Sequence, residues 1–267
     1  MTQPSGATLR REGAVGIVTI RNPSARNALD DSTRRELLLR LLQANADPMS
    51  TAVVITGEAG HFCAGGELRS MPTERQAAAA RLGEMHSIVR CVVEGPKPYI
   101  AAVEGSAYGS GFALASACDM VVAAPSAVFG STFGRVGLAP DTGLAWTLPR
   151  RIGTQRARDF LLRGRVVDAS TAHELGIVDL VDEGPDLTGS AVSLAQDWFG
   201  EASAAALAST RRLLESSSRD FGQFLDTELG LQSTLLGSRN FVEGRNAFFE
   251  KRAPKFENRR SDASSSS

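Results

Sequence analysis

The sequence has 267 residues, 42% of them hydrophobic and 22% charged, which excludes an intrinsically disordered chain and suits one large globular domain or two unequal ones. Its 29 lysines and arginines nearly balance 30 aspartates and glutamates; this argues against a dedicated nucleic-acid binder but allows a local basic pocket for a phosphorylated small molecule. No apolar run is long enough to span a membrane, and the N-terminal residues lack the apolar segment of a signal peptide.

The first two thirds of the chain predict short buried strands that alternate with helices. Runs rich in Val, Ile and Ala predict strands over 13–20, 52–56, 99–103 and 119–123. Apolar residues at helical spacing predict helices over 31–46, 76–93 and 111–117, the first with a capping box of Thr33 and Glu36. Glycine-rich loops at 57–66 and 105–111 follow two of the strands, so the layout is α/β.

The composition changes after residue 168. The last predicted strand is 177–181, and residues 187–250 read as successive helices with few β-branched runs. We therefore predict an α/β core over 1–195 and a C-terminal helical region over 196–258. Residues 259–267 form a polar, serine-rich tail that is expected to be disordered.

The first glycine-rich loop ends in the segment HFCAGGEL, residues 61–68. Two adjacent glycines allow unusual backbone angles and the close approach of a ligand. If a helix begins near Leu68, the amide of Gly66 points outward at its start, where it suits an oxyanion. A simple tight turn between strand and helix fits this segment equally well.

The second loop contains Gly109-Ser110-Gly111 and allows three interpretations. A dinucleotide-binding loop lacks its third glycine, because Leu114 stands there, and an esterase elbow lacks both flanking glycines. The third interpretation fits best: Ser110 supplies a second backbone N–H donor at a helix start, and its side chain is incidental.

The cysteines and histidines indicate no metal site. Cys63, Cys91 and Cys118 are odd in number and form no CxxC pair, which disfavours a disulfide framework and a zinc site and suits a reducing cytosol. The three histidines of the chain are too scattered to share a metal.

Taken together, the two loops resemble the crotonase, or enoyl-CoA hydratase/isomerase, superfamily. The matching segments are FCAGGEL (62–68) and KPYIAAVEGSAYGSGFALASACDMVVAA (97–124), with further matches at 21–29, 137–153, 172–178 and 243–256. The resemblance covers roughly residues 10–256 and is specific for the superfamily rather than for one reaction.

The resemblance implies a spiral of repeated ββα units, with C-terminal helices that assemble homotrimers, often paired into hexamers as a dimer of trimers. It implies an acyl-coenzyme A thioester as substrate, no separate cofactor, and no nucleic-acid or membrane partner. Gly66 and Ser110 match the two oxyanion donors, which stabilise the charge that builds on the thioester oxygen when a neighbouring C–H proton is removed.

The resemblance also assigns residues to the substrate. Arg26, Arg69 and Lys251 match positions that contact the CoA phosphates or adenine, Lys251 often from a neighbouring subunit together with Phe248. Glu67 is the acidic residue of the glycine motif, which we interpret as a hydrogen-bond partner that orients the loop. The backbone carbonyl oxygen of Ala64 is expected to accept from the adenine amino group. The remaining predicted substrate contacts are Ala28, Leu68, Tyr108, Phe112, Ala113, Phe133 and Pro140.

Two departures from the superfamily pattern limit the chemistry. Members that add water use two glutamates, and Ala113 and Phe133 stand at the matching positions here. Neither side chain holds or activates water, which argues against ordinary hydration.

One carboxylate remains, Asp141 in the segment LAPDTG. This element and the following WTLPR resemble the ring 1,2-epoxyphenylacetyl-CoA isomerases and related enoyl-CoA isomerases, in which the matching Asp is the acid/base. Phe112, Phe133 and Trp146 are expected to surround the carboxylate and raise its pKa. Asp141 also suits the N-cap of the helix through Trp146, and both roles stay open.

The sequence therefore predicts a cytoplasmic acyl-CoA enzyme that moves a double bond or ring by proton transfer, with Gly66 and Ser110 as donors and Asp141 as proton shuttle. A hydratase-like lyase or an aryl-CoA dehalogenase-like enzyme is the alternative within the superfamily. The alternative of another class is a protein that binds acyl-CoA without catalysis.

Overall fold

The computed structural model describes residues 5–199, 203–216 and 221–255, and the predicted tail at 259–267 lies outside this part of the chain. Nine strands form two sheets within it. The six-stranded sheet has the order β1 (Gly6–Glu12), β2 (Val15–Arg21), β3 (Ala52–Gly57), β4 (Tyr99–Val103), β6 (Met120–Ala123) and β9 (Leu180–Val181). All its neighbours pair in parallel except β1 with β2. The smaller sheet has the order β5 (Ser106–Tyr108), β7 (Val128–Gly130) and β8 (Val166–Asp168).

Ten α-helices and two short 3-10 helices connect the strands in the described residues. The helices up to residue 175 are α1 (Asp31–Ala46), α2 (Arg75–Val93), α3 (Ser110–Ala117), α4 (Leu144–Ile152), α5 (Thr154–Leu162) and α6 (Ala169–Leu175), with η1 (Pro23–Ala25) and η2 (Phe133–Val136). The later helices are α7 (Leu187–Phe199), α8 (Ala204–Ser216), α9 (Phe221–Leu236) and α10 (Arg239–Phe249).

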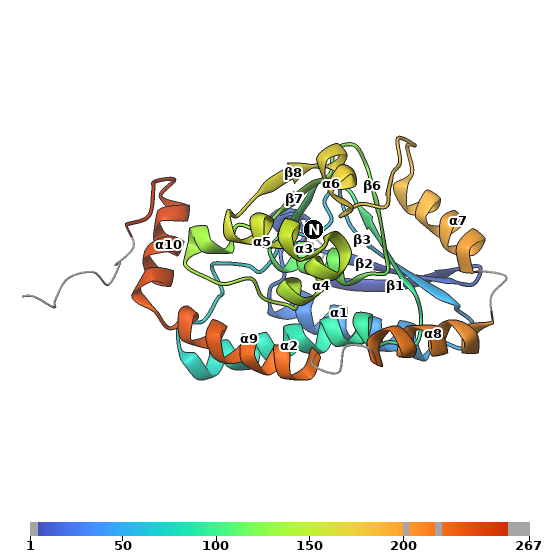
Figure 1. Cartoon of the computed structure of the whole chain (residues 1–267), viewed down its shortest axis with the longest axis horizontal. Helices are drawn as coiled ribbons and strands as arrows, with labels where there is room; N and C mark the ends of the chain where they lie inside the picture. Colours follow the sequence, from blue (N-terminus) through green and yellow to red (C-terminus); the bar gives the residue numbers. More distant parts are fainter. Residues whose placement is uncertain (1–4, 200–202, 217–220, 256–267) are drawn as a thin grey trace, which may run out of the picture.

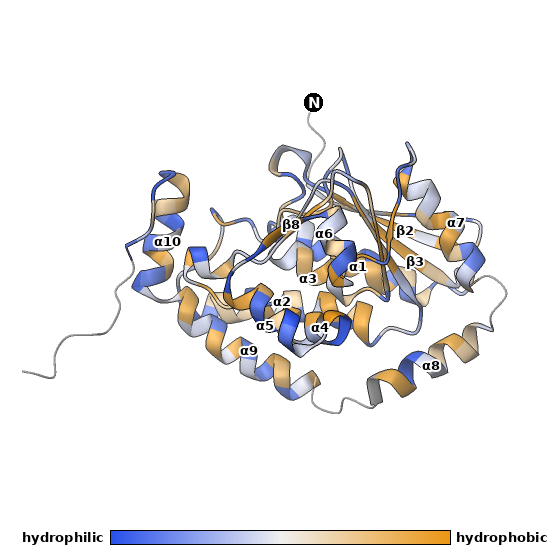
Figure 2. Ribbon diagram, turned by 45° about the horizontal axis from the view of Figure 1, so that its top comes forward, coloured by the Kyte–Doolittle hydropathy of each residue, from blue (hydrophilic) through white to orange (hydrophobic). Residues whose placement is uncertain are grey.

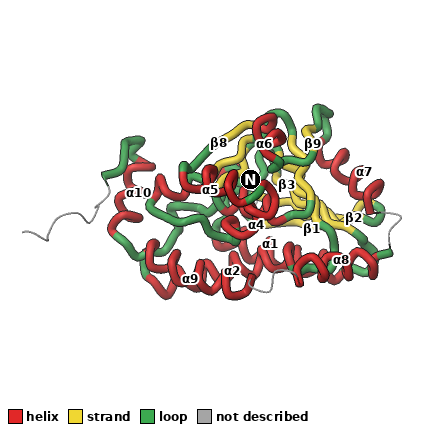
Figure 3. The backbone as a smooth tube through the Cα atoms, in the orientation of Figure 1, coloured by secondary structure: helices red, strands yellow, loops and turns green. Residues whose placement is uncertain are grey.

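The large sheet lies at the centre with helices on both faces (Figures 1 and 3). In β2, Val15 and Ile17 pack against α7, whereas Val18 and Ile20 belong to the main core on the opposite face. Because each central strand is buried on both faces, it reads as a continuous apolar run rather than an alternating one. The strands are accordingly among the most hydrophobic parts of the ribbon (Figure 2).

The C-terminal helices contact the rest of the chain at separate places. α7 covers one face of the large sheet, α9 packs along α2, and α10 contacts η2 at one end of the molecule (Figure 1). Arg211 of α8 donates to the carbonyls of Val92, Val93 and Gly95 and also pairs with Asp119, which fastens α8 to the end of α2.

The predicted α/β layout is confirmed, and the differences concern short elements and one cap. β1 was not predicted, because it is an edge strand whose outer residues include charged side chains. β5, β7 and β8 have three residues each, too short for a periodic pattern. The predicted capping box is wrong: Asp30 caps α1 by accepting from the Thr33 amide at 2.7 Å. The predicted division at residue 195 stays a prediction.

Candidate active site

Two glycine-rich loops leave the carboxyl ends of the neighbouring parallel strands β3 and β4 and lie against each other. Cys63 of the first loop bridges Ala107 of the second. The Cys63 amide donates to the Ser106 carbonyl at 2.8 Å, and the Tyr108 amide donates to the Cys63 carbonyl at 3.0 Å. Ligands of open α/β sheets bind at this edge, so the topology already places a site here.

The close approach of the two loops and the turn into α3 each require a glycine. Gly65 has φ +95°, and a Cβ there would lie 2.7 Å from the Tyr108 carbonyl oxygen. Gly109 has φ +52° and ψ −122°, a combination that residues with a Cβ atom rarely adopt. The chain turns there into α3.

Gly66 and Ser110, the predicted oxyanion donors, both line the cavity next to these loops. In the described part of the chain, neither amide is a donor in the backbone hydrogen bonds that hold the loops together. Ser110 is the first residue of α3, where amides have no partner within the helix and the helix dipole is positive. Both amides are therefore available to an oxygen atom, and their convergence on one point stays a prediction.

The cavity has a volume of about 690 Å³ and a largely apolar wall. Its apolar side chains include Leu68, Met71, Phe133, Val136 and Leu138. Arg26, Arg135 and Phe248 also belong to its lining. A cavity of this size can hold a long organic ligand. Its apolar side chains can contact an apolar part of the ligand, and the guanidinium groups of Arg26 and Arg135 can contact an anionic part.

Asp141 is the sole carboxylate among the described residues that line the cavity. It lies in the segment 139–143, which we call the Asp141 loop. Its Oδ1 accepts from the hydroxyls of Ser110 at 3.2 Å and Thr142 at 3.0 Å, and its Oδ2 accepts from Nε2 of Gln232 at 3.0 Å. The alternative role as a helix cap is wrong, because Gly143 occupies the N-cap of α4 and no side chain caps that helix.

The surroundings of Asp141 disfavour its charge. The side chain is buried, with 5% of its surface exposed, and this burial raises the pKa of Asp141 above its usual value. Hydrogen bonds from Gln232, Thr142 and Ser110 and the positive charge of Arg81 lower the pKa, but only partly offset the burial. A carboxyl group whose pKa is raised by burial, and which still has hydrogen-bond donors for its ionised form, is a candidate acid/base.

A second buried group supports the Asp141 loop from α9. Glu228 accepts from the Gly143 amide at 3.1 Å, and its Oε1 lies 2.8 Å from Nε2 of His86 on α2. Burial raises the pKa of Glu228, and the charge of Asp141 raises it further. Arg81 of α2 is also buried, which lowers its pKa to about 10.

The structure brings nine of the sixteen predicted site residues to the cavity wall: Gly66, Ser110, Asp141, Arg26, Ala64, Leu68, Tyr108, Phe133 and Phe248. Phe248 reaches the cavity from α10 of the same chain. The other seven are outside the lining: Ala28, Glu67, Arg69, Phe112, Ala113, Pro140 and Lys251.

Glu67 and Arg69 make contacts beside the cavity. The Glu67 carboxylate accepts from the amides of Arg69 and Ser70, so it holds the turn after the first loop. The Arg69 guanidinium lies over the ring of Phe249 at 5.1 Å. Lys251 is exposed. The predicted contacts of Ala28, Arg69, Pro140 and Lys251 with coenzyme A stay predictions.

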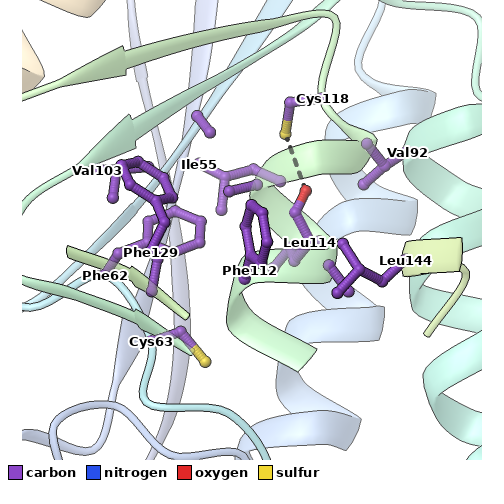
Figure 4. Packing of buried hydrophobic residues seen from close by; sticks show 14 of the residues in the cluster. Ile55, Phe62, Cys63, Val92, Val103, Phe112, Leu114, Cys118, Phe129 and Leu144 are labelled. Atoms are coloured by element: carbon purple, nitrogen blue, oxygen red, sulfur yellow. Dashed lines mark hydrogen bonds between the residues drawn. The ribbon is translucent and has the colours of Figure 1, made fainter. Parts of the chain in front are cut away.

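Three sequence-based interpretations need correction. Phe112 and Ala113, predicted as substrate contacts, are outside the cavity lining and fully buried on α3. Phe112 packs against Phe129 (Figure 4) and against Phe160. Trp146 packs on Phe221 rather than around Asp141. The Ser110 side chain is not incidental, since its hydroxyl donates to Asp141.

Sequence reasoning missed Gln232, Glu228, His86, Arg81 and Arg135. The sequence contains a signal for the first two, because they interrupt an apolar stripe of α9. The buried residues at helical spacing on this helix are Phe221, Leu225, Glu228, Gln232 and Leu236, and only Glu228 and Gln232 of these five are polar. Nothing in the pattern identifies their partners.

No three His, Cys, Asp or Glu side chains gather as metal ligands in the residues that the structure describes. Within the same residues, no helix is both long and apolar enough to cross a membrane.

Comparisons with known proteins agree with this geometry. The sequence model of the enoyl-CoA hydratase/isomerase family matches residues 10–259. A probable enoyl-CoA hydratase of Rhodobacter capsulatus is 34% identical over 262 residues, covering 94% of this chain and 98% of the relative. The 1,2-epoxyphenylacetyl-CoA isomerase of Escherichia coli is 34% identical over 259 residues, covering 92% and 95%.

Solved structures show the same fold. The crystal structure of an enoyl-CoA hydratase from Mycobacterium avium subsp. paratuberculosis superposes with a TM-score of 0.84 at 28% identity, covering 95% of this chain and 99% of that one. The predicted spiral architecture is thereby confirmed.

Proposed function

Because the chain belongs to the enoyl-CoA hydratase/isomerase family, we propose that it isomerises an acyl-CoA thioester, moving a double bond or ring by proton transfer. One observation carries the proposal. Among the described residues, Asp141 is the single carboxylate of a cavity that also contains the amides of Gly66 and Ser110. One carboxylate suffices for a proton shift, because the group that takes a proton from one carbon can return it to another.

In the proposed reaction, ionised Asp141 takes a proton from a carbon of the acyl chain. The electron pair of the broken C–H bond moves toward the thioester and leaves negative charge on its oxygen, where the N–H groups of Gly66 and Ser110 stabilise the charge. The protonated Asp141 then donates to a second carbon, and the enolate collapses to the isomerised thioester. The raised pKa of Asp141 suits both halves, since the group must act as base and then as acid.

Hydration is the second candidate, favoured by the names of the relatives, several of which are called probable enoyl-CoA hydratases. It would have to proceed with Ala113 buried in α3 and Phe133 in the cavity wall, at the two positions where the superfamily pattern has glutamates. Neither side chain offers a group that could activate water.

The deciding experiment compares isomerisation of a 3-enoyl-CoA with hydration of a 2-enoyl-CoA for wild type and Asp141→Asn. The Asn amide can donate to the Ser110 and Thr142 hydroxyls, which also act as acceptors, so the variant is expected to fold. We expect isomerisation to fall by ~10²–10⁴ while thioester binding persists. Asp226→Asn, which removes an exposed carboxylate on α9, is the control. Brisk hydration by wild type, or full isomerisation by Asp141→Asn, would contradict the proposal.

We propose, on the basis of the family, that the enzyme is cytoplasmic and assembles as a homotrimer or a dimer of trimers. The exposed apolar side chains of Leu231, Val242 and Phe248 on α9 and α10 support burial against another copy. Light scattering of the purified chain measures the mass, and a monomer at micromolar concentration would oppose this assembly.

A further inference from the structure

The inner face of α9 carries two polar residues, Glu228 and Gln232, one helical turn apart. Both are buried, with 6% and 1% of their surface exposed, and both reach the Asp141 loop. The helix itself lies along α2, away from the strands and glycine loops of the site (Figure 1). A buried polar residue costs free energy unless it is hydrogen-bonded, and both side chains have partners in the Asp141 loop.

The Gln232 amide bridges two atoms of the Asp141 loop. Its Oε1 accepts from the backbone N–H of Ala139 at 3.1 Å, and its Nε2 donates to Oδ2 of Asp141 at 3.0 Å. A backbone N–H can only donate, so the Gln232 oxygen must face Ala139 and the nitrogen must face Asp141. The two partners therefore allow only one of the two possible orientations of the Gln232 amide.

The hydrogen bonds of Asp141 leave its two oxygens in different states. A carboxylate offers about four acceptor positions, two on each oxygen. Oδ1 uses both, for the hydroxyls of Ser110 and Thr142, whereas Oδ2 uses one, for Gln232. The free acceptor position therefore belongs to Oδ2, the oxygen whose direction Gln232 sets.

We propose that Gln232 is the positioning residue of Asp141, and that its amide presents Oδ2 as the atom that takes and returns the substrate proton. The inference rests on the proposed function, because it concerns how the proposed base is held. Glu228 acts on the same loop: its bond with the Gly143 amide fixes the loop two residues beyond Asp141. α9 thus holds the Asp141 loop on both sides of the carboxylate.

The charged and titratable groups near Asp141 come from two helices. Arg81 of α2 faces Asp141 with a positive charge, and Glu228 of α9 faces it with a carboxylate that is itself paired with His86 of α2. These three groups are unchanged when Gln232 is replaced. A change in the pH dependence of Gln232→Leu therefore reports the lost amide donor.

The test uses three variants on α9. Gln232→Leu keeps the approximate size and removes both hydrogen bonds. Gln232→Glu keeps the acceptor for Ala139 but places a second carboxylate against Oδ2, where two oxygens must share a proton. Ser233→Ala is the matched control: Ser233 is buried next to Gln232, and its hydroxyl donates only to the Gly230 carbonyl in the bonds that the structure gives.

The measurement is kcat and KM for a 3-enoyl-CoA as a function of pH, together with deuterium uptake from D₂O into the acyl chain. We expect both Gln232 variants to lose roughly ten- to a hundredfold in kcat at neutral pH, with KM changed less than about threefold. The acid limb of the profile moves to higher pH, further for Gln232→Glu than for Gln232→Leu. Deuterium uptake falls in parallel, and Ser233→Ala matches wild type in every readout.

Three outcomes overturn the inference. If Asp141→Asn abolishes turnover but both Gln232 variants keep the wild-type profile, Gln232 does not position the base and the proposed function stands. If the variants lose kcat with no movement of the acid limb, the role of Gln232 is structural only. If Asp141→Asn itself keeps full activity, the inference and the proposed function fail together.

Discussion

Replacing Asp141 by Asn is expected to stabilise the protein at neutral and alkaline pH while it removes the proposed base. Burial raises the pKa of this carboxyl, so the folded state binds its proton more tightly than the unfolded chain does. The folding free energy therefore becomes less favourable as the pH rises from the unfolded pKa to the folded pKa. The Asn side chain does not ionise and avoids this loss.

The magnitude follows from linkage. Each unit by which the folded pKa exceeds the unfolded one costs about 1.4 kcal/mol at a pH above both values. A domain of this size gains roughly 2–4 °C in Tm for each kcal/mol. Asp141→Asn is therefore expected to melt above wild type at pH 8, because burial raises the pKa of Asp141 in the folded state and these two conversions turn that rise into a higher Tm for the variant.

The assay is thermal unfolding of wild type and Asp141→Asn at matched protein concentration between pH 4 and pH 8. The difference in Tm should be small at pH 4, which is close to the pKa of an Asp in the unfolded chain, and largest at pH 8. Asp226→Asn, on the exposed face of α9, should show no such trend. A variant less stable than wild type at pH 8, or a difference that stays constant across the range, would refute the reasoning.

Two further predictions concern the glycine loops. Ser110→Ala keeps the backbone donor but loses the hydroxyl bond to Asp141. This bond favours the ionised form of Asp141, so its loss should move the acid limb of the pH profile of kcat to higher pH and leave KM unchanged. An unchanged pH profile would show that the hydroxyl does not act on the base. Gly65→Ala forces a Cβ to 2.7 Å from the Tyr108 carbonyl at φ +95° and should cost ~1–3 kcal/mol in urea unfolding and weaken thioester binding. Gly83→Ala, in open space on α2, is its control; equal behaviour of the two would contradict the strain argument.

The sequence predicted elements well where a hydrophobic period extends over enough residues. The helix 31–46 and the strand 99–103 were predicted with their observed ends, because an apolar stripe and a buried apolar run are local signals. The three-residue strands of the small sheet are formed by pairing between distant segments, such as β7 with β8, and have no period of their own. Their formation depends on tertiary contacts.

In the candidate site too, residues within a local motif were predicted and residues brought in from distant segments were not. Its backbone donors and its carboxylate were predicted because each lies within a short motif, around Gly66, Ser110 and Asp141. The groups that hold the carboxylate were not, because Gln232 comes from a helix 91 residues further along the chain. A helical stripe shows that such a residue is buried, but which buried atom it meets is decided only by how α9 packs on α2.

The features around the Asp141 loop are individually unfavourable for a folded protein. Asp141 and Glu228 are buried carboxyl groups with raised pKa values, and the buried Nε of Arg81 has no hydrogen-bond partner among the described residues. Thr142, β-branched and fully buried, holds φ at +56°. A chain selected for stability alone would place apolar groups and ordinary backbone here, since buried charges are replaced by packed hydrophobic residues at little cost or with a gain. Asp141 lines the cavity together with Gly66 and Ser110, while Thr142 bonds to Asp141, Glu228 bonds to the Asp141 loop and the charge of Arg81 acts on Asp141. The concentration of unfavourable features around one carboxyl group in a cavity is typical of a functional site, and it points to the same place as the sequence motifs.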